Sequence, residues 1–514
     1  MANRLWLALS LALAAMPAQA QITTARVTGG EVAGTAAGGL SIFKGIPFAA
    51  PPLGGLRWRA PQPLRPWSGV RQAREFAPAC MQDAAMARQM GHPGTLSEDC
   101  LYLNIWTPAK SPSEKLPVIV WIYGGGFTGG MTSTPLYDGA HFARRGVVFV
   151  SIAYRVGPMG FLATPALSRE SGHGSGSWGM LDQVAGLKWV QANIAKFGGD
   201  PAKVTILGHS AGAYAVSILT ASPLARGLFR GVIAESGANF GPAQTAPEQG
   251  GMNLRTLAMA EADGQAFLDR LGAHNLAEAR ALPAEMVQAG KGGRFWPPLD
   301  GYVLPADQAV LWASHKFNDV PVLIGSTSDE TAAFGRQTSS PDAFEKMVRA
   351  GYGAGADAIL AAYRHDTPED ATRAAKWIGR DTTFGWPAHA WASLQTRYGK
   401  GRAFVYYWDK PTPQNPDGSG HGSEVGYVFG TYATRMPNAT DADQALSDRL
   451  QRYWVNFATN LDPNGPGLAP WPAFRADQPM VMRLGSNEGA APYPNREKLQ
   501  ALDAYYAWRR SGEK

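Results

Sequence analysis

Short, continuous apolar runs alternate with amphipathic helical segments along this chain. Residues 182–196 and 446–459 place apolar side chains three and four positions apart, the spacing of a helix that buries one face. An apolar run of strand length without polar interruption suits a strand that helices cover on both faces. The alternation predicts an α/β architecture with a large, mainly parallel sheet flanked by helices. The runs interpreted as strands are residues 118–122, 147–152, 204–207, 320–324 and 404–407.

Two stretches interrupt this alternation, residues 240–300 and 335–380. We interpret both as helical insertions over the carboxyl edge of the sheet, where the sites of α/β proteins lie. Hydrophobic residues make up 45% of the 514 residues and charged residues only 17%, and such a composition can bury one large core. We therefore expect a single domain over residues 21–514.

Residues 1–20 have the pattern of a secretory signal peptide. Arg4 supplies the positive end, residues 5–15 are apolar, and Ala18-Gln19-Ala20 is a small-x-small cleavage site. The apolar stretch is shorter than a membrane-spanning helix, and no later segment reaches that length. We expect an exported protein, periplasmic or secreted, that starts near Gln21 and associates with no membrane. A buried N-terminal helix is the alternative interpretation.

The basic residues are scattered along the chain. The net charge is +6 at pH 7, yet no basic run is longer than a pair. Nucleic-acid binding requires a concentrated basic patch, so we expect no nucleic-acid partner. A mild preference for anionic substrates is compatible with this charge.

Cys80 and Cys100 are the only cysteines. In an oxidising compartment an isolated pair usually forms a disulfide, which here would close a loop of about 20 residues. Two reduced, buried thiols are the alternative. A metal site is disfavoured because the two cysteines lack further ligands at suitable spacing.

Residues 208–212 read Gly-His-Ser-Ala-Gly, and they stand between a strand-like run and a helix-compatible run, residues 213–219. Strand, sharp turn and helix form the context of a nucleophile elbow, in which the serine projects from the turn. Ser210 would then lie at the positive end of the following helix, which favours an oxyanion. A G-x-S-x-G pattern also arises by chance, but this context predicts that Ser210 is a nucleophile.

A glycine run follows another predicted strand, in residues 123–127 (Tyr-Gly-Gly-Gly-Phe). Glycines there let backbone N–H groups point at a substrate oxygen without obstruction by side chains. The N–H groups of Gly125, Gly126 and Ala211 are therefore predicted to form an oxyanion hole with three donors. A phosphate-binding loop is the rival interpretation, and it lacks the Gly-Lys-Ser/Thr ending of such loops.

The chain resembles the type-B carboxylesterase family, which includes the cholinesterases. The resemblance implies an α/β-hydrolase fold, hydrolysis of small-molecule carboxylic esters, a disulfide between Cys80 and Cys100, and no metal or organic cofactor. It covers nearly all of the chain after residue 20. The stretches that carry it are residues 43–49 (Phe-Lys-Gly-Ile-Pro-Phe-Ala), 51–54 (Pro-Pro-Leu-Gly), 97–104 (Ser-Glu-Asp-Cys-Leu-Tyr-Leu-Asn), 197–201 (Phe-Gly-Gly-Asp-Pro) and 453–457 (Tyr-Trp-Val-Asn-Phe).

The resemblance also implies the partners of the serine. Glu330 matches the acid of the family, with Asp329 as the alternative, and His421 matches the base. The order Ser, Glu, His along the chain is the one that this fold produces. In such a triad the histidine takes the proton of the serine, and the acid holds the histidine in the required tautomer. Ser236 matches a family serine that supports the acid by a hydrogen bond.

The sequence departs from the family at three places. His209 stands where the family usually has Glu, and we expect its side chain to point away from Ser210. Thr331 stands where Gly usually follows the acid. The loop between the two cysteines contains no Trp, and a choline cation needs an aromatic face or a carboxylate, so choline esters are disfavoured.

The acyl pocket is predicted from a segment of the second half of the chain. Gly292 and Gly293 precede residues 295–301 (Phe-Trp-Pro-Pro-Leu-Asp-Gly), which match a family segment beside the acyl group. Glycines add no side-chain volume, so acyl groups larger than acetyl should fit, including aromatic or carboxylate-bearing ones. Lys291 and Arg294 place positive charge nearby. The alternative is a flexible surface turn with solvated charges. The pocket residues predicted are Gly292, Gly293, Trp296 and Phe334.

The main functional prediction is therefore a serine hydrolase of carboxylic esters that works through an acyl-enzyme. One alternative is a catalytically silent binding protein of the same fold, although such relatives typically lose the serine. Another is an amidase or peptidase, which uses the same triad. The sequence leaves open the natural ester, the stereopreference and the oligomeric state.

Overall fold

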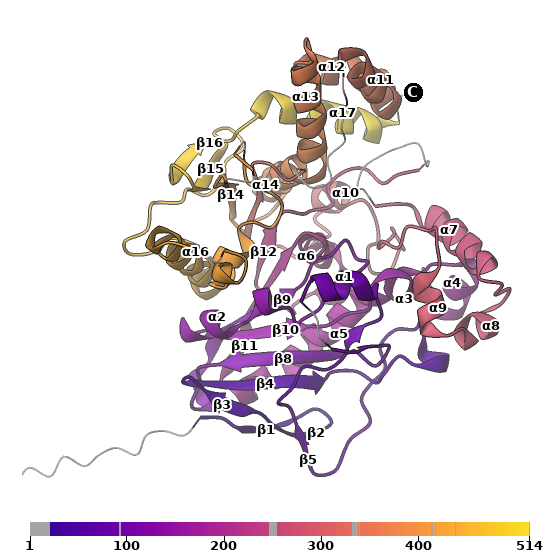
Figure 1. Ribbon diagram of the computed structural model, residues 1–514, viewed down its shortest axis with the longest axis vertical. Coiled ribbons are helices and arrows are strands. Elements are labelled where there is room, and N and C mark those ends of the chain that lie inside the picture. Colours follow the sequence, from indigo (N-terminus) through magenta and orange to yellow (C-terminus); the bar gives the residue numbers. More distant parts are fainter. Residues whose placement is uncertain are drawn as a thin grey trace, which may run out of the picture.

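An 11-stranded sheet runs through the molecule in the computed structural model, which describes residues 21–512 except 92–93, 246–253, 332–337, 339, 413–414, 417 and 437 (Figure 1). The central strands from β10 to β15 are parallel, and the antiparallel strands lie at the two ends. In spatial order the strands are β16 (Gly489–Pro492), β15 (Met480–Gly485), β14 (Ala403–Asp409), β13 (Val322–Thr327), β12 (Gly231–Glu235), β11 (Gly199–His209), β9 (Leu116–Ile122), β10 (Val148–Ile152), β8 (Tyr102–Thr107), β4 (Leu40–Pro47) and β3 (Thr35–Ala37).

The predicted α/β architecture is confirmed. All five apolar runs fall in the parallel part of the sheet, in β9, β10, β11, β13 and β14. Nearly all of their residues are buried, on both faces of the sheet, which explains why the runs are strongly apolar, with only Ser151 and Thr205 as polar members. Two small sheets lie beside the main one. They consist of β1 (Thr24–Val27), β2 (Gly30–Ala33) and β5 (Val70–Gln72), and of β6 (Ala79–Cys80) and β7 (Leu96–Ser97).

Helices cover the sheet from both sides (Figure 1). The helix α6 packs on β11 and β12, next to α5, and α14 packs on β13 and β14. The helices α2 and α16 cover the opposite face. The two predicted helical segments lie in α5 and α16. The bounds of these helices are α2 (Ala140–Arg144), α5 (Trp178–Asn193), α6 (Ala211–Ala221), α14 (Trp386–Tyr398) and α16 (Asp441–Asn460).

Both predicted insertions are helical, and they leave the sheet at the carboxyl ends of β12 and β13. The first packs against α3 and α4, and the second packs against α17 at the far end of the molecule (Figure 1). Their helices are α7 (Leu257–Arg270), α8 (Leu276–Ala281), α9 (Ala284–Ala289), α11 (Pro341–Tyr352), α12 (Ala356–Ala362) and α13 (Pro368–Arg380), and the remaining helices are α1 (Ala84–Gln89), α3 (Gly157–Phe161), α4 (Pro165–Ser171), α10 (Gln308–Ala313), α15 (Val425–Phe429) and α17 (Arg496–Ser511).

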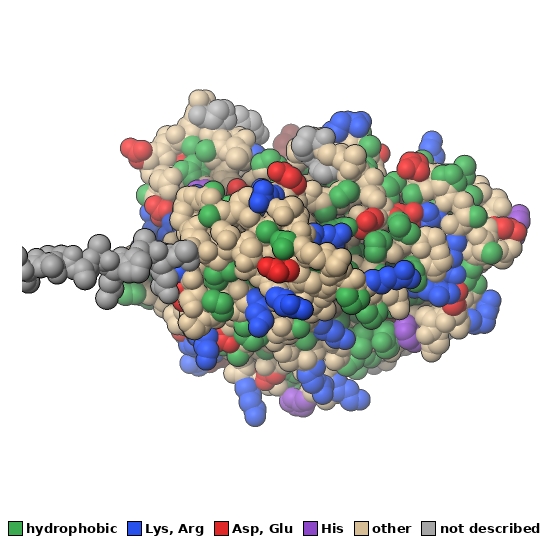
Figure 2. Space-filling model, turned by 90° about the horizontal axis from the view of Figure 1, so that it is seen from below, with side chains coloured by type: hydrophobic (Ala, Val, Ile, Leu, Met, Phe, Trp, Pro, Cys, Tyr) green, Lys and Arg blue, Asp and Glu red, His purple; other side chains and the backbone are tan. Residues whose placement is uncertain are grey.

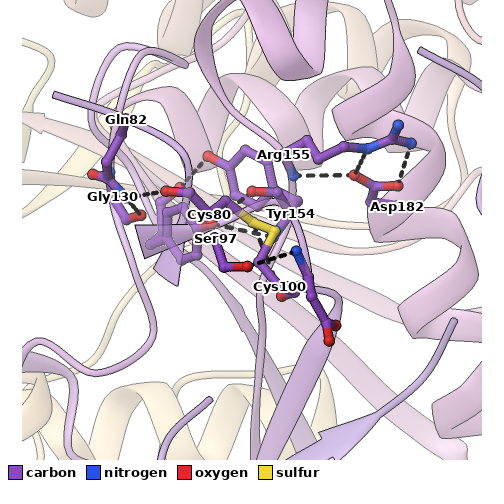
Figure 3. Close-up of a disulfide and its surroundings, with 10 residues drawn as sticks. Cys80, Gln82, Ser97, Cys100, Gly130, Tyr154, Arg155 and Asp182 are labelled. Atoms are coloured by element: carbon purple, nitrogen blue, oxygen red, sulfur yellow. Dashed lines mark hydrogen bonds and ion pairs between the residues drawn. A yellow bond between two sulfur atoms is a disulfide. The ribbon is translucent and has the colours of Figure 1, made fainter. Parts of the chain in front are cut away.

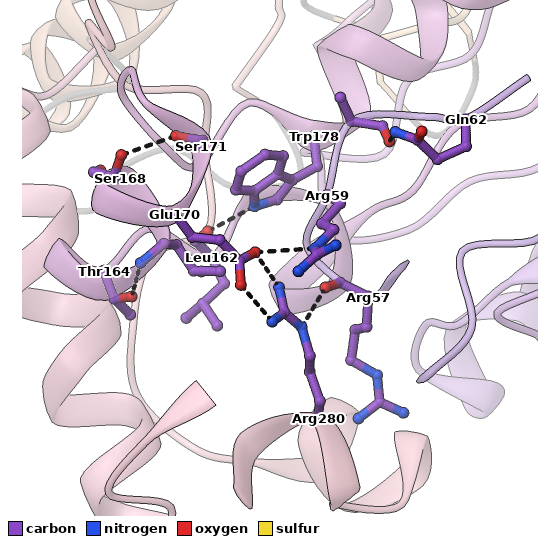
Figure 4. A network of polar contacts seen from close by, with 12 residues as sticks. Arg57, Arg59, Gln62, Leu162, Thr164, Ser168, Glu170, Ser171, Trp178 and Arg280 are labelled. Carbon is purple, nitrogen blue, oxygen red and sulfur yellow. Dashed lines mark hydrogen bonds and ion pairs between the residues drawn. The ribbon is translucent and has the colours of Figure 1, made fainter. Parts of the chain in front are cut away.

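The first insertion is anchored by a network of charged groups (Figure 4). Arg280 on α8 forms an ion pair with Glu170 on α4 at 2.6 Å, and Arg59 reaches the same carboxylate at 3.1 Å. Arg280 also donates to the carbonyl oxygen of Arg57. The hydrogen bond from Arg280, aided by Arg59 and opposed by burial, lowers the pKa of Glu170 to about 2. The carboxylate thus stays charged and ties the insertion to the N-terminal part of the chain.

The predicted disulfide between Cys80 and Cys100 is present (Figure 3). Both cysteines are buried, and a loop of this length stabilises the fold by about 3 kcal/mol through chain entropy. The side chain of Gln82, inside the loop, donates to the carbonyl oxygens of Cys80 at 3.0 Å and Gly130 at 2.9 Å, and it accepts from the N–H of Gly130. The disulfide loop is therefore bonded to the loop that follows β9.

Charges are spread over the face drawn in Figure 2, where Lys and Arg side chains alternate with acidic and apolar ones and form no single patch. Among the described residues, no helix combines the length and apolar character needed to cross a bilayer. The predicted signal peptide, residues 1–20, lies outside the described part of the chain.

Candidate active site

Ser210 stands on a sharp turn between β11 and α6. Its backbone has φ 55° and ψ −124°, a conformation that few residues other than glycine adopt. A Cβ at Gly208 would collide with the carbonyl group of Gly212, and a Cβ at Gly212 would collide with that of Ile122. Both glycines of the motif are thus required by close backbone approach, whereas the strained φ belongs to the serine itself. The N–H of Ser210 donates to the backbone carbonyl oxygen of Glu235, on the neighbouring strand, at 2.8 Å.

The glycine loop after β9 packs directly against this turn. A Cβ at Gly124 would lie 2.5 Å from the carbonyl oxygen of His209 and 2.9 Å from Cβ of Ser210. Gly125 and Gly126 have φ angles of 116° and 64°, which other residues rarely adopt. Gln82 holds the far end of the loop, at Gly130, as described above.

The three N–H groups predicted for the oxyanion hole lie around this turn. Among the hydrogen bonds of the described residues, none engages the backbone N–H of Gly125 or Gly126. Ala211 is the first residue of α6, where an N–H has no partner within the helix. Within the described part of the chain, none of the three N–H groups is therefore seen with a hydrogen-bond partner.

His421 and Glu330 meet at the carboxyl end of the sheet. Nδ1 of His421 lies 2.5 Å from Oε2 of Glu330. The other carboxylate oxygen accepts the N–H of Thr327 at 2.7 Å, and Glu330 is fully buried. Burial lowers the pKa of His421, but the charge and the hydrogen bond of Glu330 outweigh it, so the pKa lies above the usual 6.5.

Asp329, the alternative acid, faces elsewhere. Its carboxylate lies 2.6 Å from Nζ of Lys376 and accepts from the side chain of Asn415 at 2.9 Å. The backbone N–H of Asp329 donates to the backbone carbonyl oxygen of Ser419. The structure thus brings Glu330, and not Asp329, into contact with His421.

Two rings flank His421. The ring of His209 lies 4.7 Å from it and that of Phe384 lies 4.8 Å from it, measured between centroids. Phe384 belongs to a π-helical turn, Asp381–Gly385, inserted between α13 and α14; such turns recur at functional sites. The His209 side chain is buried, and burial together with the neighbouring charge of His421 lowers its pKa well below the usual value. His209 is thus a neutral ring packed against the histidine.

Two further carboxyl groups are buried behind the histidine, and sequence analysis did not identify them. Glu424 accepts from the hydroxyls of Tyr406 at 3.1 Å and Ser236 at 3.3 Å. Glu235 accepts from the indole N–H of Trp454 at 2.6 Å. Burial, and then the charge of Glu330, raises the pKa of Glu424 to about 7. The pKa of Glu235 is also raised well above its usual value, first by burial and then by the charge of Glu424.

The contact of Ser236 differs from the expectation. Its hydroxyl was expected to support the acid Glu330 directly, but it donates to Glu424 instead. Ser236 directly follows β12, whose last residue is Glu235, and its backbone has a positive φ of 55°. Ser236 therefore touches a carboxyl that neighbours the histidine–glutamate pair.

Glu424 gives a test of this electrostatic arrangement. Its negative charge favours the protonated form of His421, so Glu424→Gln should lower the pKa of His421. The acid limb of the pH profile of kcat/KM should then move to lower pH by a fraction of a pH unit, since Glu424 is itself partly protonated near pH 7. Glu235→Gln is the matched control and should shift the limb less. An unmoved limb, or one at higher pH, would contradict the arrangement.

Of the predicted acyl-pocket residues, Trp296 is buried beside two aromatic side chains. Its ring packs edge-on against Phe127, at 5.1 Å, and Tyr214, at 5.5 Å. Gly292 and Gly293 are exposed, with φ angles of 79° and 92°.

The groups nearest to a side chain at the two glycines belong to the insertion. They are the guanidinium of Arg270 for Gly292 and the ring of Phe295 for Gly293. The two glycines thus lie in an exposed turn of the insertion. Phe334 lies outside the described residues.

No set of three or more His, Cys, Asp or Glu side chains within the described ranges is grouped as metal ligands. What the described groups do offer is a serine on a strained turn, backbone donors beside it and a histidine on a buried carboxylate. This combination is suited to acyl transfer, in which a base activates a hydroxyl and donors stabilise a tetrahedral oxyanion.

Comparison with known proteins agrees with this chemistry. The model of the Carboxylesterase family matches residues 17–502. Fumonisin B1 esterase of Sphingopyxis macrogoltabida is 36% identical over 486 residues, which cover 89% of this chain and 86% of that protein. Human cocaine esterase is 34% identical over 522 residues, 90% of this chain and 89% of that protein. A solved PNB esterase structure superposes with a TM-score of 0.82 at 32% identity, covering 94% of this chain and 99% of that one. The chain therefore belongs to the carboxylesterase family and is an ester hydrolase of the α/β-hydrolase fold.

Proposed function

We propose that Ser210 is the nucleophile, His421 the general base and Glu330 the acid that orients it. His421 takes the proton of Ser210 as the hydroxyl attacks the ester carbonyl, and it later gives a proton to the leaving alcohol. Water then hydrolyses the acyl-enzyme with the same histidine as base. The observation that carries the proposal is the 2.5 Å contact between His421 and Glu330, at the same sheet edge as the strained turn of Ser210.

The proposed oxyanion hole consists of the N–H groups of Gly125, Gly126 and Ala211. Its support is the packing of the glycine loop on the serine turn, which leaves these donors without partners among the described hydrogen bonds. Donors that are held in place before the reaction stabilise the tetrahedral intermediate without a reorganisation cost. No metal or organic cofactor takes part in the proposed cycle.

We also propose that the protein is exported, periplasmic or secreted, after removal of residues 1–20. The signal-peptide pattern of that segment supports this location. The disulfide between Cys80 and Cys100 is consistent with it, because disulfides persist in oxidising compartments.

A matched pair of substrates tests the reaction class. With 4-nitrophenyl butyrate and butyryl 4-nitroanilide, which share one acyl group, we expect kcat/KM to be larger for the ester by orders of magnitude. The backbone donors suit both substrates, but an anilide nitrogen needs a better-placed acid to leave. Comparable rates would indicate an amidase, and turnover of neither substrate would indicate a silent binding protein.

A further inference from the structure

The side-chain amide of Gln82 joins the disulfide loop to the glycine loop that carries two of the proposed oxyanion donors (Figure 3). Its nitrogen donates to the carbonyl oxygens of Cys80 at 3.0 Å and Gly130 at 2.9 Å, and its oxygen accepts the N–H of Gly130 at 2.8 Å. Gln82 thus meets both backbone groups of Gly130, as a neighbouring strand would. Both residues are buried, so removing the amide would take these partners from Gly130 in a place that water reaches poorly.

The base of the Gln82 side chain is fixed on both sides. Cys80, two residues earlier, is bridged to Cys100. Asp83, the next residue, caps α1 by accepting the N–H of Met86 at 2.7 Å. A side chain anchored in this way has little freedom to move with the loop that it contacts, so it can hold that loop in place.

The part of the glycine loop that Gln82 holds lies directly against the proposed donors. A Cβ at Gly130 would collide with the carbonyl oxygen of Gly124, and a Cβ at Gly125 would collide with the carbonyl group of Gly129. The N–H of Gly129 donates to the carbonyl oxygen of Gly125 at 3.2 Å. The loop therefore folds back on itself, and its return at Gly130 packs on its start.

The hydrogen bond at the carbonyl oxygen of Gly125 determines where the next N–H points. This oxygen and the N–H of Gly126 belong to one peptide group, which is planar and directs the two groups in opposite directions. Because the oxygen is bonded to the returning part of the loop, the N–H of Gly126 is directed away from it. A shift of Gly129 and Gly130 would rotate this peptide group and so move a proposed oxyanion donor.

We propose that Gln82 is a positioning residue for the oxyanion hole: by holding Gly130, it keeps the N–H of Gly126 aimed at the oxygen that becomes negative during acyl transfer. Its action is indirect, through the glycine loop. Donors held in place stabilise the transition state more than the bound ester, so loss of Gln82 should slow the chemical steps more than it weakens ester binding. This inference rests on the proposed function, because it explains how the donors of the same site are held.

Gln82→Met tests the proposal, since it removes the three hydrogen bonds and keeps the length of the side chain. With 4-nitrophenyl butyrate we expect kcat and kcat/KM to fall together by roughly 10- to 100-fold, because a displacement of about 1 Å can cost about 100-fold. Both constants fall because the acyl-enzyme forms and is hydrolysed through an oxyanion. Wild-type kcat/KM in folded Gln82→Met would overturn the proposal.

Gln191→Met is the matched control. The amide of Gln191 also donates to two backbone carbonyl oxygens, those of Pro201 and Leu228, both at 2.9 Å. These residues lie near the amino ends of β11 and β12, whereas Ser210 follows the carboxyl end of β11. Gln191→Met should therefore leave kcat and kcat/KM unchanged. A loss as large as that of Gln82→Met would show a general effect of removing a buried amide and would overturn the proposal.

Two ketones of equal length separate positioning of the donors from general damage to the site. Trifluoromethyl hexyl ketone adds a serine hydroxyl and forms a tetrahedral oxyanion, whereas methyl hexyl ketone binds as an intact carbonyl. In Gln82→Met the inhibition constant of the first should rise by about the factor by which kcat/KM falls, and that of the second should stay unchanged. A parallel rise of both constants, or a rise of neither, would overturn the proposal. Only equal inhibition of the wild type and binding to Ser210→Ala by the fluorinated ketone would count against the proposed function itself.

Gln82→Glu covers the case in which Gln82→Met fails to fold, as judged by the thermal midpoint. Glutamate has the shape of glutamine and keeps an acceptor for the N–H of Gly130, but its carboxylate cannot donate to the two carbonyl oxygens. At about pH 8, well above the usual pKa of a glutamate, we expect the same fall in kcat/KM and the same selective loss of affinity for the fluorinated ketone. Wild-type values of both would overturn the proposal.

Discussion

Replacing Ser210 with alanine is expected to lower kcat/KM for carboxylic esters by about 10⁴-fold or more. The reason is that no acyl-enzyme can form without the hydroxyl, while the backbone donors around the turn still bind the ester. Steady-state kinetics with 4-nitrophenyl butyrate measures the loss. Ser210→Ala that retains wild-type activity would exclude this serine as the nucleophile.

The fold should survive this change. Alanine and serine meet a similar steric penalty at φ 55°, so the variant keeps the strained turn at a comparable cost. Far-ultraviolet circular dichroism and the thermal midpoint of the variant should therefore match those of the wild type. A substitution that also unfolded the protein would make the kinetic loss uninformative. These two measurements distinguish loss of catalysis from loss of the fold.

Replacing His421 with alanine should cost about as much as replacing Ser210, because triad members act as a unit. The double variant should be no slower than either single variant. Glu330→Gln should lose roughly 10³- to 10⁴-fold, since a neutral amide no longer favours the required tautomer of His421. Rates are measured with the same ester at the pH optimum.

Asp329→Asn is the matched control for the acid. Asp329 contacts Lys376 and Asn415 instead of His421, so its loss should change kcat/KM little. A larger loss in Asp329→Asn than in Glu330→Gln would reassign the acid.

The pH profile adds an independent check. Because the pKa of His421 is raised above 6.5, activity should fall as the pH drops through a value above 6.5, where the base becomes protonated.

Much of the sheet was predictable because its central strands are buried on both faces. The runs in β9, β10, β11, β13 and β14 are strongly apolar, and their only polar members, Ser151 and Thr205, are small and fully buried. The strand β12 was not identified, because Gly231 and Glu235 leave only three apolar residues between them. Glu235 is tolerated there because Trp454 donates to its carboxyl group.

The parts of the site differ in how far the sequence could predict them. Ser210 is recognisable locally, because strand, turn and helix are contiguous. Glu330 and His421 are 91 positions apart, and only resemblance to a family linked them. The contact between Ser236 and Glu424 spans 188 positions and carries no local signal. Glu424 could be noticed only as an acidic residue directly before the apolar helix α15.

The acyl-pocket prediction depended on residue type where backbone conformation mattered. Gly292 and Gly293 are predicted to remove volume from a pocket wall, and the structure adds that both are exposed and have the positive φ angles of a turn. The two cations predicted beside the pocket also differ in their surroundings. Lys291 is exposed, whereas Arg294 stacks on Trp296. Sequence alone does not show which of the two cations, three positions apart, packs against a ring.

The most direct measurement of the central claim is labelling with a fluorophosphonate probe, followed by peptide mass spectrometry of the adduct. An activated serine beside an oxyanion hole attacks the phosphorus, and the adduct stays on the nucleophile. The account predicts one label per chain, located on Ser210, with loss of esterase activity in proportion to labelling and no label on Ser210→Ala. A label on another serine, or an active protein that the probe does not modify, would contradict it.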